Sequence, residues 1–318
     1  MPIADIERST EQATALLRAA VVGAVGSTEI LLAELSRAEG WQVPLVVTLP
    51  PELHGRHSDI VDLAPHAAAA GAELLYVART NDAATLSAVR AAQPDYVFVV
   101  GWSQIVNAEF LNIAARGSIG YHPAPLPRLR GRAAIPWTIL LDEPISASSL
   151  FWIGEGTDDG DILAQRYFHV ARDETAQSLY DKHMDALGAL LREVLPKLAS
   201  GQQPRTPQDD RFATWATKRT PADGRIDWQE SATSIHRLVR AVGSPYPGAF
   251  TTLGSRHLTV SGTRLVSGTE RHHAMPGQIV AKIGDSLVVQ TGDGLLEITD
   301  WTFEDGRSPA IHSILGRG

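Results

Sequence analysis

The chain of 318 residues contains no cysteine. This absence excludes disulfide bonds, a catalytic thiolate and zinc sites built on cysteine, although it does not fix a cellular compartment. Long hydrophobic runs are also missing: the apolar runs are the size of strands, such as 96–100, whereas a membrane-spanning helix needs about 20 apolar residues. Residues 1–14 carry charges where the hydrophobic part of a secretory signal would lie, so we expect a cytoplasmic protein with no membrane contact.

Positive charge is scarce, with 28 Lys and Arg against 36 Asp and Glu and a formal net charge of −8. Proteins that grip long nucleic acids usually present a basic face, because neutralising phosphates supplies most of the non-specific affinity. The charge balance therefore argues against a nucleic-acid partner, although a local basic groove stays open. A hydrophobic content of 44% with 20% charged residues is typical of a globular protein, and the length admits one large domain or two smaller ones.

Strand-like and helix-like segments alternate through the first two hundred residues. Apolar runs predict strands at 19–23, 43–49, 73–77, 95–100, 118–121 and 147–153, and helical periodicity predicts helices at 29–39, 81–92 and 175–196. This alternation indicates an α/β fold, with a mostly parallel, Rossmann-like sheet covered by helices on both faces. Ligands of such sheets bind beyond the carboxyl ends of the strands. Residues that follow the strands ending near 100 and 119 are therefore site candidates.

The pattern changes after 199–204, a stretch rich in small and polar residues that is typical of a linker. One helix is predicted at 231–242, and short strands punctuated by glycine are predicted at 257–261, 277–282, 286–291 and 295–298. The pattern indicates a small C-terminal β-barrel domain, similar to an OB-fold. We therefore predict two domains, residues 1–204 and 205–318.

His122 directly follows a predicted strand and begins a stiff loop. Pro123, Pro125 and Pro127 restrict the backbone of that loop to few conformations. Three arginines, suited to phosphates or carboxylates, follow at positions 128, 130 and 132. A single histidine is more often structural than catalytic, and this position at a strand end leaves both roles open for His122.

A second polar loop, residues 154–165, follows the strand predicted at 147–153. It holds Asp158, Asp159 and Asp161, more carboxylates than a simple turn needs. The spacing lacks the ligand pattern of an EF-hand calcium loop, and the residues alone do not say which carboxylate matters. The chain also lacks the HExxH zinc pair and the GxSxG nucleophile elbow, which disfavours metalloprotease and serine hydrolase chemistry. Residues 23–27 lack the third glycine of a dinucleotide fingerprint and favour a tight turn.

Several of these motifs, in order, resemble those of the folate-dependent formyltransferases. His122 with its Leu-Pro loop and the Arg-Gly at 130–131 resembles the first signature of that family, and 156–161 resembles the second, with Asp158 as its aspartate, 36 residues after His122. The motifs at 218–221, 226–228 and 240–250 resemble the C-terminal domain of methionyl-tRNA formyltransferase and its amino-sugar relatives. The resemblance covers nearly the whole chain. The stretches RGRAAIPW and SPYPGAF are similar to those of enzymes acting on UDP-4-amino-4-deoxy-arabinose and other nucleotide-linked amino sugars.

The resemblance implies that an amine attacks the formyl carbon of 10-formyltetrahydrofolate through a tetrahedral intermediate, without a metal. His122 would take the amine proton or, once protonated, support the oxyanion, and Asp158 would orient the imidazole and favour its charged form. Further residues are implied as ligands: for the folate Trp102, Gln104, Ile105, Val106, Ile153 and Asp158, and for the acceptor Tyr121, Arg130 and Arg132. The two arginines are candidates for holding either a diphosphate or the glutamate tail of the folate.

The chain departs from the family pattern at Gly120, where the family has an asparagine whose amide stabilises the oxyanion. Only three asparagines occur, at positions 81, 107 and 112. Asn107 and the hydroxyl of Tyr121 are candidate replacements, and Tyr121 is the weaker because neighbours along a strand point to opposite faces. The departure also motivates the alternative of a folate-binding or ligand-binding homologue without catalysis.

The leading hypothesis for the acceptor is the amine of a nucleotide-linked amino sugar. N-hydroxyornithine, as in formylated siderophores, and methionyl-tRNA are the two alternatives among enzymes. The acidic balance of the chain disfavours the tRNA. The resemblance leaves monomer and homodimer both open.

Overall fold

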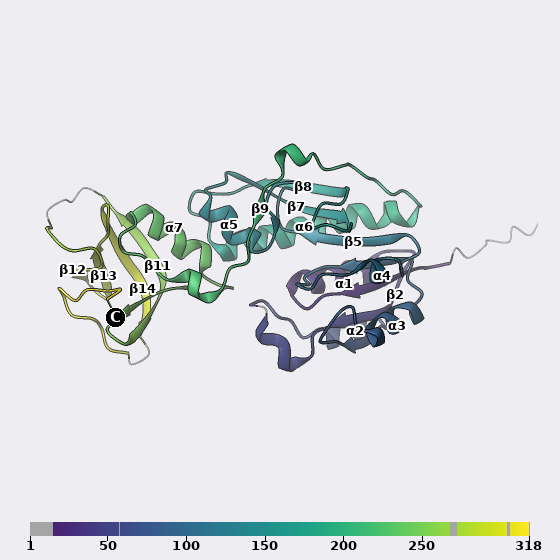
Figure 1. Cartoon of the computed structure of the whole chain (residues 1–318), viewed down its shortest axis with the longest axis horizontal. Helices are drawn as coiled ribbons and strands as arrows, with labels where there is room; N and C mark the ends of the chain where they lie inside the picture. The colour runs from purple at the N-terminus through teal and green to yellow at the C-terminus, as the bar shows by residue number, and fades with distance from the viewer. Residues whose placement is uncertain (1–14, 57, 268–271, 304–305, 318) are drawn as a thin grey trace, which may run out of the picture.

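The computed structural model describes residues 15–56, 58–267, 272–303 and 306–317. Residues 1–14, where the sequence predicted no secretory signal, lie outside the described residues. Among the helices of the described part, none is long and apolar enough to cross a membrane. A large sheet with its helices and a smaller sheet occupy opposite ends of the elongated molecule (Figure 1).

The large sheet has seven strands and confirms the mostly parallel architecture. Its strands are β1 (Leu17–Val22), β2 (Trp41–Thr48), β3 (Glu73–Tyr76), β4 (Tyr96–Val99), β5 (Gly117–His122), β7 (Ile145–Trp152) and β8 (Ile162–His169), in the spatial order β3-β2-β1-β4-β5-β7-β8. The first five strands pair in parallel, whereas β7 pairs antiparallel with both of its neighbours, β5 and β8. As a result, the carboxyl end of β5 lies beside the middle of β7, and the end of β7 lies beside the first half of β5.

Helices cover both faces of this sheet, as predicted. They are α1 (Gly26–Arg37), α2 (Ala64–Ala69), α3 (Ala83–Ala91), α4 (Ala108–Leu111), α5 (Ala134–Leu140) and α6 (Ala176–Ala199). Apolar residues of α1, α2 and α6 share one core cluster, and those of α3 and α4 belong to another. Helix α6 starts with Thr175 as its N-cap and continues past the predicted end at 196, because Leu198 extends its buried stripe.

The C-terminal part forms a helix and an antiparallel sheet, which confirms a small β domain. Helix α7 (Ala232–Val242) precedes β10 (Ala249–Leu253), β11 (Arg256–Val266), β12 (Ile279–Ile283), β13 (Ser286–Gln290) and β14 (Leu295–Phe303), in the order β10-β11-β14-β13-β12. Strand β10 was not predicted, because its sequence AFTTL is short and mostly without large apolar residues. Its hydrogen bonds to β11 hold it in the sheet.

The two parts of the molecule share one apolar core. Ile135 and Ile139 of α5 and Leu179 of α6 belong to the same buried cluster as Ile235 and Val239 of α7. Helix α7 lies between the large sheet's helices and the small sheet (Figure 1). The C-terminal domain is therefore packed against α5 and α6 of the large domain through continuous apolar contact.

The segment after α6 returns across the large domain before it enters the C-terminal domain. A two-stranded parallel pair, β6 (Arg130–Gly131) with β9 (Trp215–Ala216), marks the crossing. This brings residues 205–217 against the loop that follows His122.

Candidate functional site

His122 ends β5 and lies opposite Ser149 of β7 in the strand register. The residue is buried, and its Nε2 lies 2.7 Å from the carbonyl oxygen of Leu129. Because a carbonyl oxygen only accepts hydrogen bonds, Nε2 must carry the hydrogen of the neutral ring. The nitrogen left to exchange protons is therefore Nδ1.

Asp158 faces that second nitrogen, with 3.6 Å between its Oδ2 and Nδ1 of His122. The same Oδ2 accepts a hydrogen bond of 2.8 Å from the backbone N–H of Gly131. Asp158 has a φ of +51°, a left-handed conformation uncommon for residues other than glycine. A proton gained at Nδ1 would come to lie beside a carboxylate, so the pair can accept a proton and hold the resulting positive charge.

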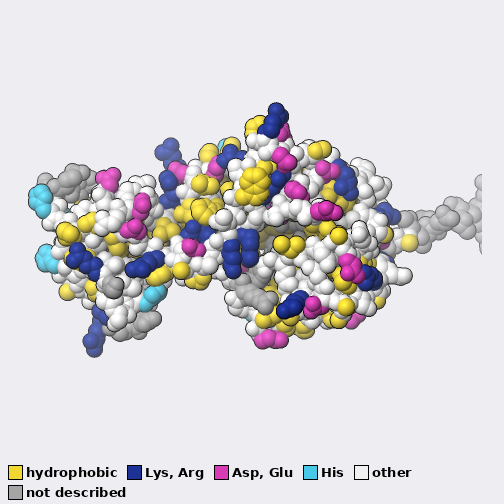
Figure 2. Space-filling model, viewed as in Figure 1, with side chains coloured by type: hydrophobic (Ala, Val, Ile, Leu, Met, Phe, Trp, Pro, Cys, Tyr) yellow, Lys and Arg dark blue, Asp and Glu magenta, His cyan; other side chains and the backbone are white. Residues whose placement is uncertain are grey.

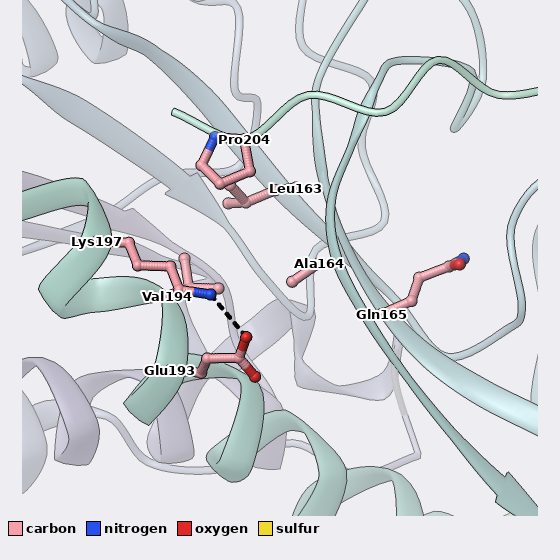
Figure 3. Close-up of a pocket in the computed structure, with 7 residues that line it drawn as sticks. All are labelled: Leu163, Ala164, Gln165, Glu193, Val194, Lys197 and Pro204. Carbon is pink, nitrogen blue, oxygen red and sulfur yellow. Dashed lines mark hydrogen bonds and ion pairs between the residues drawn. The ribbon is translucent and has the colours of Figure 1, made fainter. Parts of the chain in front are cut away.

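The proline loop after His122 is fixed by side chains of β7 and β8. Ser149 donates from Oγ to the carbonyl of Ala124 (2.6 Å), and Gln165 donates from Nε2 to the carbonyl of Leu126 (2.8 Å) and to Ser149. Gln165 stands at the edge of a pocket of about 200 Å³ between β8, α6 and Pro204, and its amide points away from the rest of the lining (Figure 3). The pocket therefore lies beside the loop's support rather than at His122.

The predicted folate loop, 101–106, is pinned to the segment that follows β3. Gln104 accepts from the backbone and hydroxyl of Thr80 and donates to the carbonyl of Ala78, and the Nε1 of Trp102 donates to the hydroxyl of Thr80 (2.7 Å). The side chains of Trp102 and Gln104 are hydrogen-bonded within the protein, so the backbone groups of the loop remain to bind a ligand. Ile105, 81% exposed, has its side chain in solvent.

The remaining predicted folate ligands lie near the second loop. The backbone N–H of Ile153 donates to the carbonyl of Ser118, which fixes the end of β7 beside β5. Ile153 is half-buried, and Asp158 follows it across the loop. Ile153, Asp158 and the 101–106 loop remain predicted folate ligands.

Tyr121 points to the other face of β5 from His122. Its hydroxyl lies 3.1 Å from Oγ of Ser148 and donates to the carbonyl of His183 on α6, and burial raises the pKa of this phenol. Ser149, the next residue of β7, instead bonds the proline loop on the His122 face. Tyr121 is thus engaged within the domain, and the structure gives no support to its hydroxyl as the missing oxyanion donor.

The structure separates the two arginines that the sequence predicted as acceptor ligands. Arg130 is 4% exposed and donates to Oε1 of Gln208 (3.0 and 2.8 Å) and to Oδ1 of Asp210 (2.8 Å), so its guanidinium binds the protein itself. Arg132 is exposed, and its side chain makes no hydrogen bond or ion pair with the rest of the described chain. Arg132 is therefore the cation free to meet a ligand.

Gly120 is required by the packing of Phe151. A Cβ at this position would lie 2.7 Å from Cζ and 2.8 Å from Cε1 of the Phe151 ring, and 3.1 Å from Cγ1 of Ile153. The space that the family asparagine would enter is therefore filled by an aromatic ring. Of the two predicted replacements, Asn107 uses its Oδ1 to cap α4, and its Nδ2 stays a prediction as donor.

Gly120→Ala is expected to lower the free energy of unfolding by about 1–3 kcal/mol, the usual cost of overpacking a well-filled interior. Urea denaturation of parent and variant measures the change. Gly55→Ala is the matched control, since a Cβ there meets nothing within 4 Å. Equal effects of the two substitutions would refute the packing role of Phe151.

Sequence patterns did not reveal His183, which is fully buried on α6. Its Nδ1 lies 3.0 Å from Oγ of Ser148, and its Nε2 has no hydrogen-bond partner among the described residues. Burial, with a smaller contribution from the charge of His122, lowers the pKa of His183 from 6.5 to about 3. In the described part of the chain no group of three or more His, Asp and Glu side chains is arranged to hold a metal ion.

Solved structures with the same fold include proteins of different length. HypX from Aquifex aeolicus in complex with tetrahydrofolic acid matches 94% of this chain at 21% identity with a TM-score of 0.64, and this chain covers 45% of it. An N-formyltransferase from Helicobacter canadensis, solved with folinic acid and dTDP-3-aminofucose, matches 90% of this chain and 100% of its own at 15% identity and a TM-score of 0.65. Methionyl-tRNA formyltransferase from Clostridium thermocellum matches 80% of this chain and 96% of its own, at 18% identity and a TM-score of 0.57.

These structural matches show a shared fold. This chain spans less than half the length of the HypX chains it matches. Family membership comes from the sequence profiles. The formyl transferase profile matches residues 18–195 and includes both His122 and Asp158. The profile of the formyl transferase C-terminal domain matches residues 218–317. Together the two matches cover most of the chain, and the protein belongs to the formyl transferase family.

Proposed function

We propose that the protein transfers the formyl group of 10-formyltetrahydrofolate to the amino group of a small molecule. The observation that carries the proposal is the pair of His122 and Asp158, buried at the end of β5 within the family match, with Nδ1 facing the carboxylate. An attacking amine must lose a proton, and a ring nitrogen beside a carboxylate is suited to receive it. The imidazolium that forms would support the negative charge that develops on the tetrahedral intermediate.

The proposed donor site lies at the loop 101–106, next to the end of β4. Two structural neighbours support a reduced folate as the donor, since one was solved with tetrahydrofolic acid and the other with folinic acid. Trp102 and Gln104 fix this loop through Thr80. We therefore expect the loop's backbone N–H and C=O groups, rather than its side chains, to read the edge of the pterin ring.

For the acceptor we propose a nucleotide-linked amino sugar. The Helicobacter neighbour holds dTDP-3-aminofucose, and Arg132 offers an exposed guanidinium suited to a diphosphate. A tRNA is disfavoured by charge, since residues 205–318 carry 13 Lys and Arg against 12 Asp and Glu. Basic and acidic side chains are interspersed over the face of the molecule shown in Figure 2. N-hydroxyornithine carries no diphosphate and would offer Arg132 only its α-carboxylate.

The test supplies the purified protein with 10-formyltetrahydrofolate and a panel of amines. The panel contains UDP-linked and dTDP-linked amino sugars, the same sugars without the nucleotide, N-hydroxyornithine and methionyl-tRNA. We expect release of tetrahydrofolate and a formylated product only with nucleotide-linked sugars. Arg132→Gln is expected to raise KM for these sugars by about tenfold, because the variant loses the binding free energy of one charge-assisted contact.

Folate binding without any formyl transfer to the whole panel would contradict the enzyme and favour a binding protein. Transfer to the free sugars at the same rate as to their nucleotide-linked forms would contradict the acceptor alone. Arg128→Gln serves as the matched control, because Arg128 is an exposed arginine of the same loop that pairs with Glu143.

A further inference from the structure

The segment 205–217 lies between the two family matches, which end at 195 and resume at 218. This segment, here called the connector, follows the linker predicted at 199–204. In the structure it contacts both loops of the site, one through Gln208 and the other through Thr214. These contacts give the connector a part in the geometry of His122 and Asp158.

Gln208 bridges the two ends of the turn that contains Asp158. Its Nε2 donates to the carbonyl of Asp158 and to the carbonyl of Gly160, both at 2.7 Å. Its Oε1 accepts two hydrogen bonds from the guanidinium of Arg130. Because the cation donates to Oε1, the amide orientation is fixed and both hydrogens of Nε2 are directed at the turn.

These contacts close a ring of interactions around Asp158. Its backbone is held by Gln208, Gln208 is held by the side chain of Arg130, and the neighbouring N–H of Gly131 holds the Asp158 carboxylate. Gly131 itself lies against β9, since a Cβ there would come 2.5 Å from the carbonyl oxygen of Ala216. The ring maintains Asp158 at a positive φ that an isolated turn would not favour.

Thr214 holds Leu129, the residue whose carbonyl accepts from Nε2 of His122. Its Oγ1 accepts from the backbone N–H of Leu129 (2.9 Å), its carbonyl accepts from the N–H of Arg130 (2.9 Å), and its own N–H donates to the carbonyl of Pro127. Leu129, the acceptor for Nε2 of His122, also has a positive φ, +57°. Each side of the imidazole therefore meets a residue in an unfavourable backbone conformation that the connector stabilises.

We propose that Gln208 and Thr214 are positioning residues, which set Asp158 and the Leu129 carbonyl against the two nitrogens of His122. The inference rests on the proposed formyl transfer for its kinetic readout, while its structural content concerns the ring of His122 itself. Catalytic groups must be held to within a fraction of an ångström, and this alignment comes from a segment outside both family matches.

Gln208→Leu tests the first contact, because leucine has a similar size but cannot hydrogen-bond. We expect kcat to fall by about 10- to 100-fold, the cost of misplacing a catalytic group by about 1 Å, while KM for the folate changes less than about threefold. Gln202→Leu is the matched control, since Gln202 precedes the segment and its side chain bonds only Ser200. Gln208→Glu is expected to behave like Gln208→Leu, since it keeps the acceptor for Arg130 but loses the donors to the turn.

A readout independent of activity is the NMR spectrum of the histidine ring nitrogens, with His122 assigned from the His122→Gln variant. In the parent we expect His122 to carry its hydrogen on Nε2. The chemical shifts of the His122 ring nitrogens should change in Gln208→Leu but not in Gln202→Leu. Thr214→Val provides a second test if Gln208→Leu fails to fold, because valine has the same shape and loses only the acceptor for Leu129.

Unchanged kcat and unchanged His122 signals in folded Gln208→Leu and Thr214→Val would overturn the inference. A parent protein without formyl transfer would instead count against the proposed function, and the ring signals would still decide the role of the connector.

Discussion

His122→Gln is expected to abolish most formyl transfer, lowering kcat by about 10²- to 10⁴-fold, the usual contribution of a general acid–base. The glutamine amide can still donate to the carbonyl of Leu129, as Nε2 does now, but it has no nitrogen that can accept a proton at the place of Nδ1. The loss should therefore appear in kcat, with folate binding retained. Steady-state kinetics and a binding titration with 5-formyltetrahydrofolate measure the two quantities.

The control is His169→Gln, since His169 is an exposed histidine at the end of β8. Asp158→Asn in the same assays separates charge from shape: asparagine tolerates a positive φ and can still accept from Gly131, but it removes the charge facing Nδ1. Its kcat should fall less than that of His122→Gln. Full activity of His122→Gln would show that the site lies elsewhere.

Mild acid is expected to destabilise the protein through His183. Its pKa is lowered to about 3 in the folded state, whereas in the unfolded chain it protonates near 6.5. Between these values the unfolded state binds the extra proton, so the free energy of unfolding falls by about 1.4 kcal/mol for each unit of decreasing pH, and this contribution is fully present only above pH 6.5. The physical cause is the burial of a ring whose Nε2 lacks a partner for a second hydrogen.

Denaturation at pH 7.5 and at pH 5.0 measures this dependence. His183→Gln removes the titrating group, and we expect the parent to lose about 2 kcal/mol more than this variant between the two pH values. The variant will be less stable at both, because it loses the ring contact with Phe168, so the difference between the pH values is the quantity that counts. His169→Gln should keep the parent's full pH dependence. The same pH dependence in His183→Gln as in the parent would contradict this role of His183.

The sequence placed His122 at a strand end, and the family motif, not the strand topology, paired it with Asp158. Because β7 runs antiparallel to β5, the end of β7 lies beside the start of β5, and Asp158 reaches His122 through the loop that follows β7. Periodicity could not reveal that β7 runs antiparallel to β5, since a buried strand has the same pattern in either direction. The family motif was needed to select Asp158 from three carboxylates.

Other parts of the site depend on tertiary contacts that no local pattern encodes. Arg130 and Arg132 look alike in the sequence, and only the return of residues 205–217 buries the first and leaves the second exposed. Strand β9 has two residues, too few for a periodic signal. Thr214 and Gln208 bond backbone groups of loops that are distant in the sequence. The residues that flank them in the sequence therefore give no sign of these contacts.

The apolar core shared by α5, α6 and α7 holds the C-terminal half firmly against the large domain. Rotating the small sheet away would pull α7 out of the buried cluster that it shares with Ile139 and Leu179 and would expose apolar surface to water. Arg237, paired with Asp142, and Arg240, bonded to the carbonyl of Glu174, would lose their partners in the same motion. The C-terminal half is therefore held in place against α5 and α6, and we expect any movement that admits the proposed donor and acceptor to occur in the loops around His122.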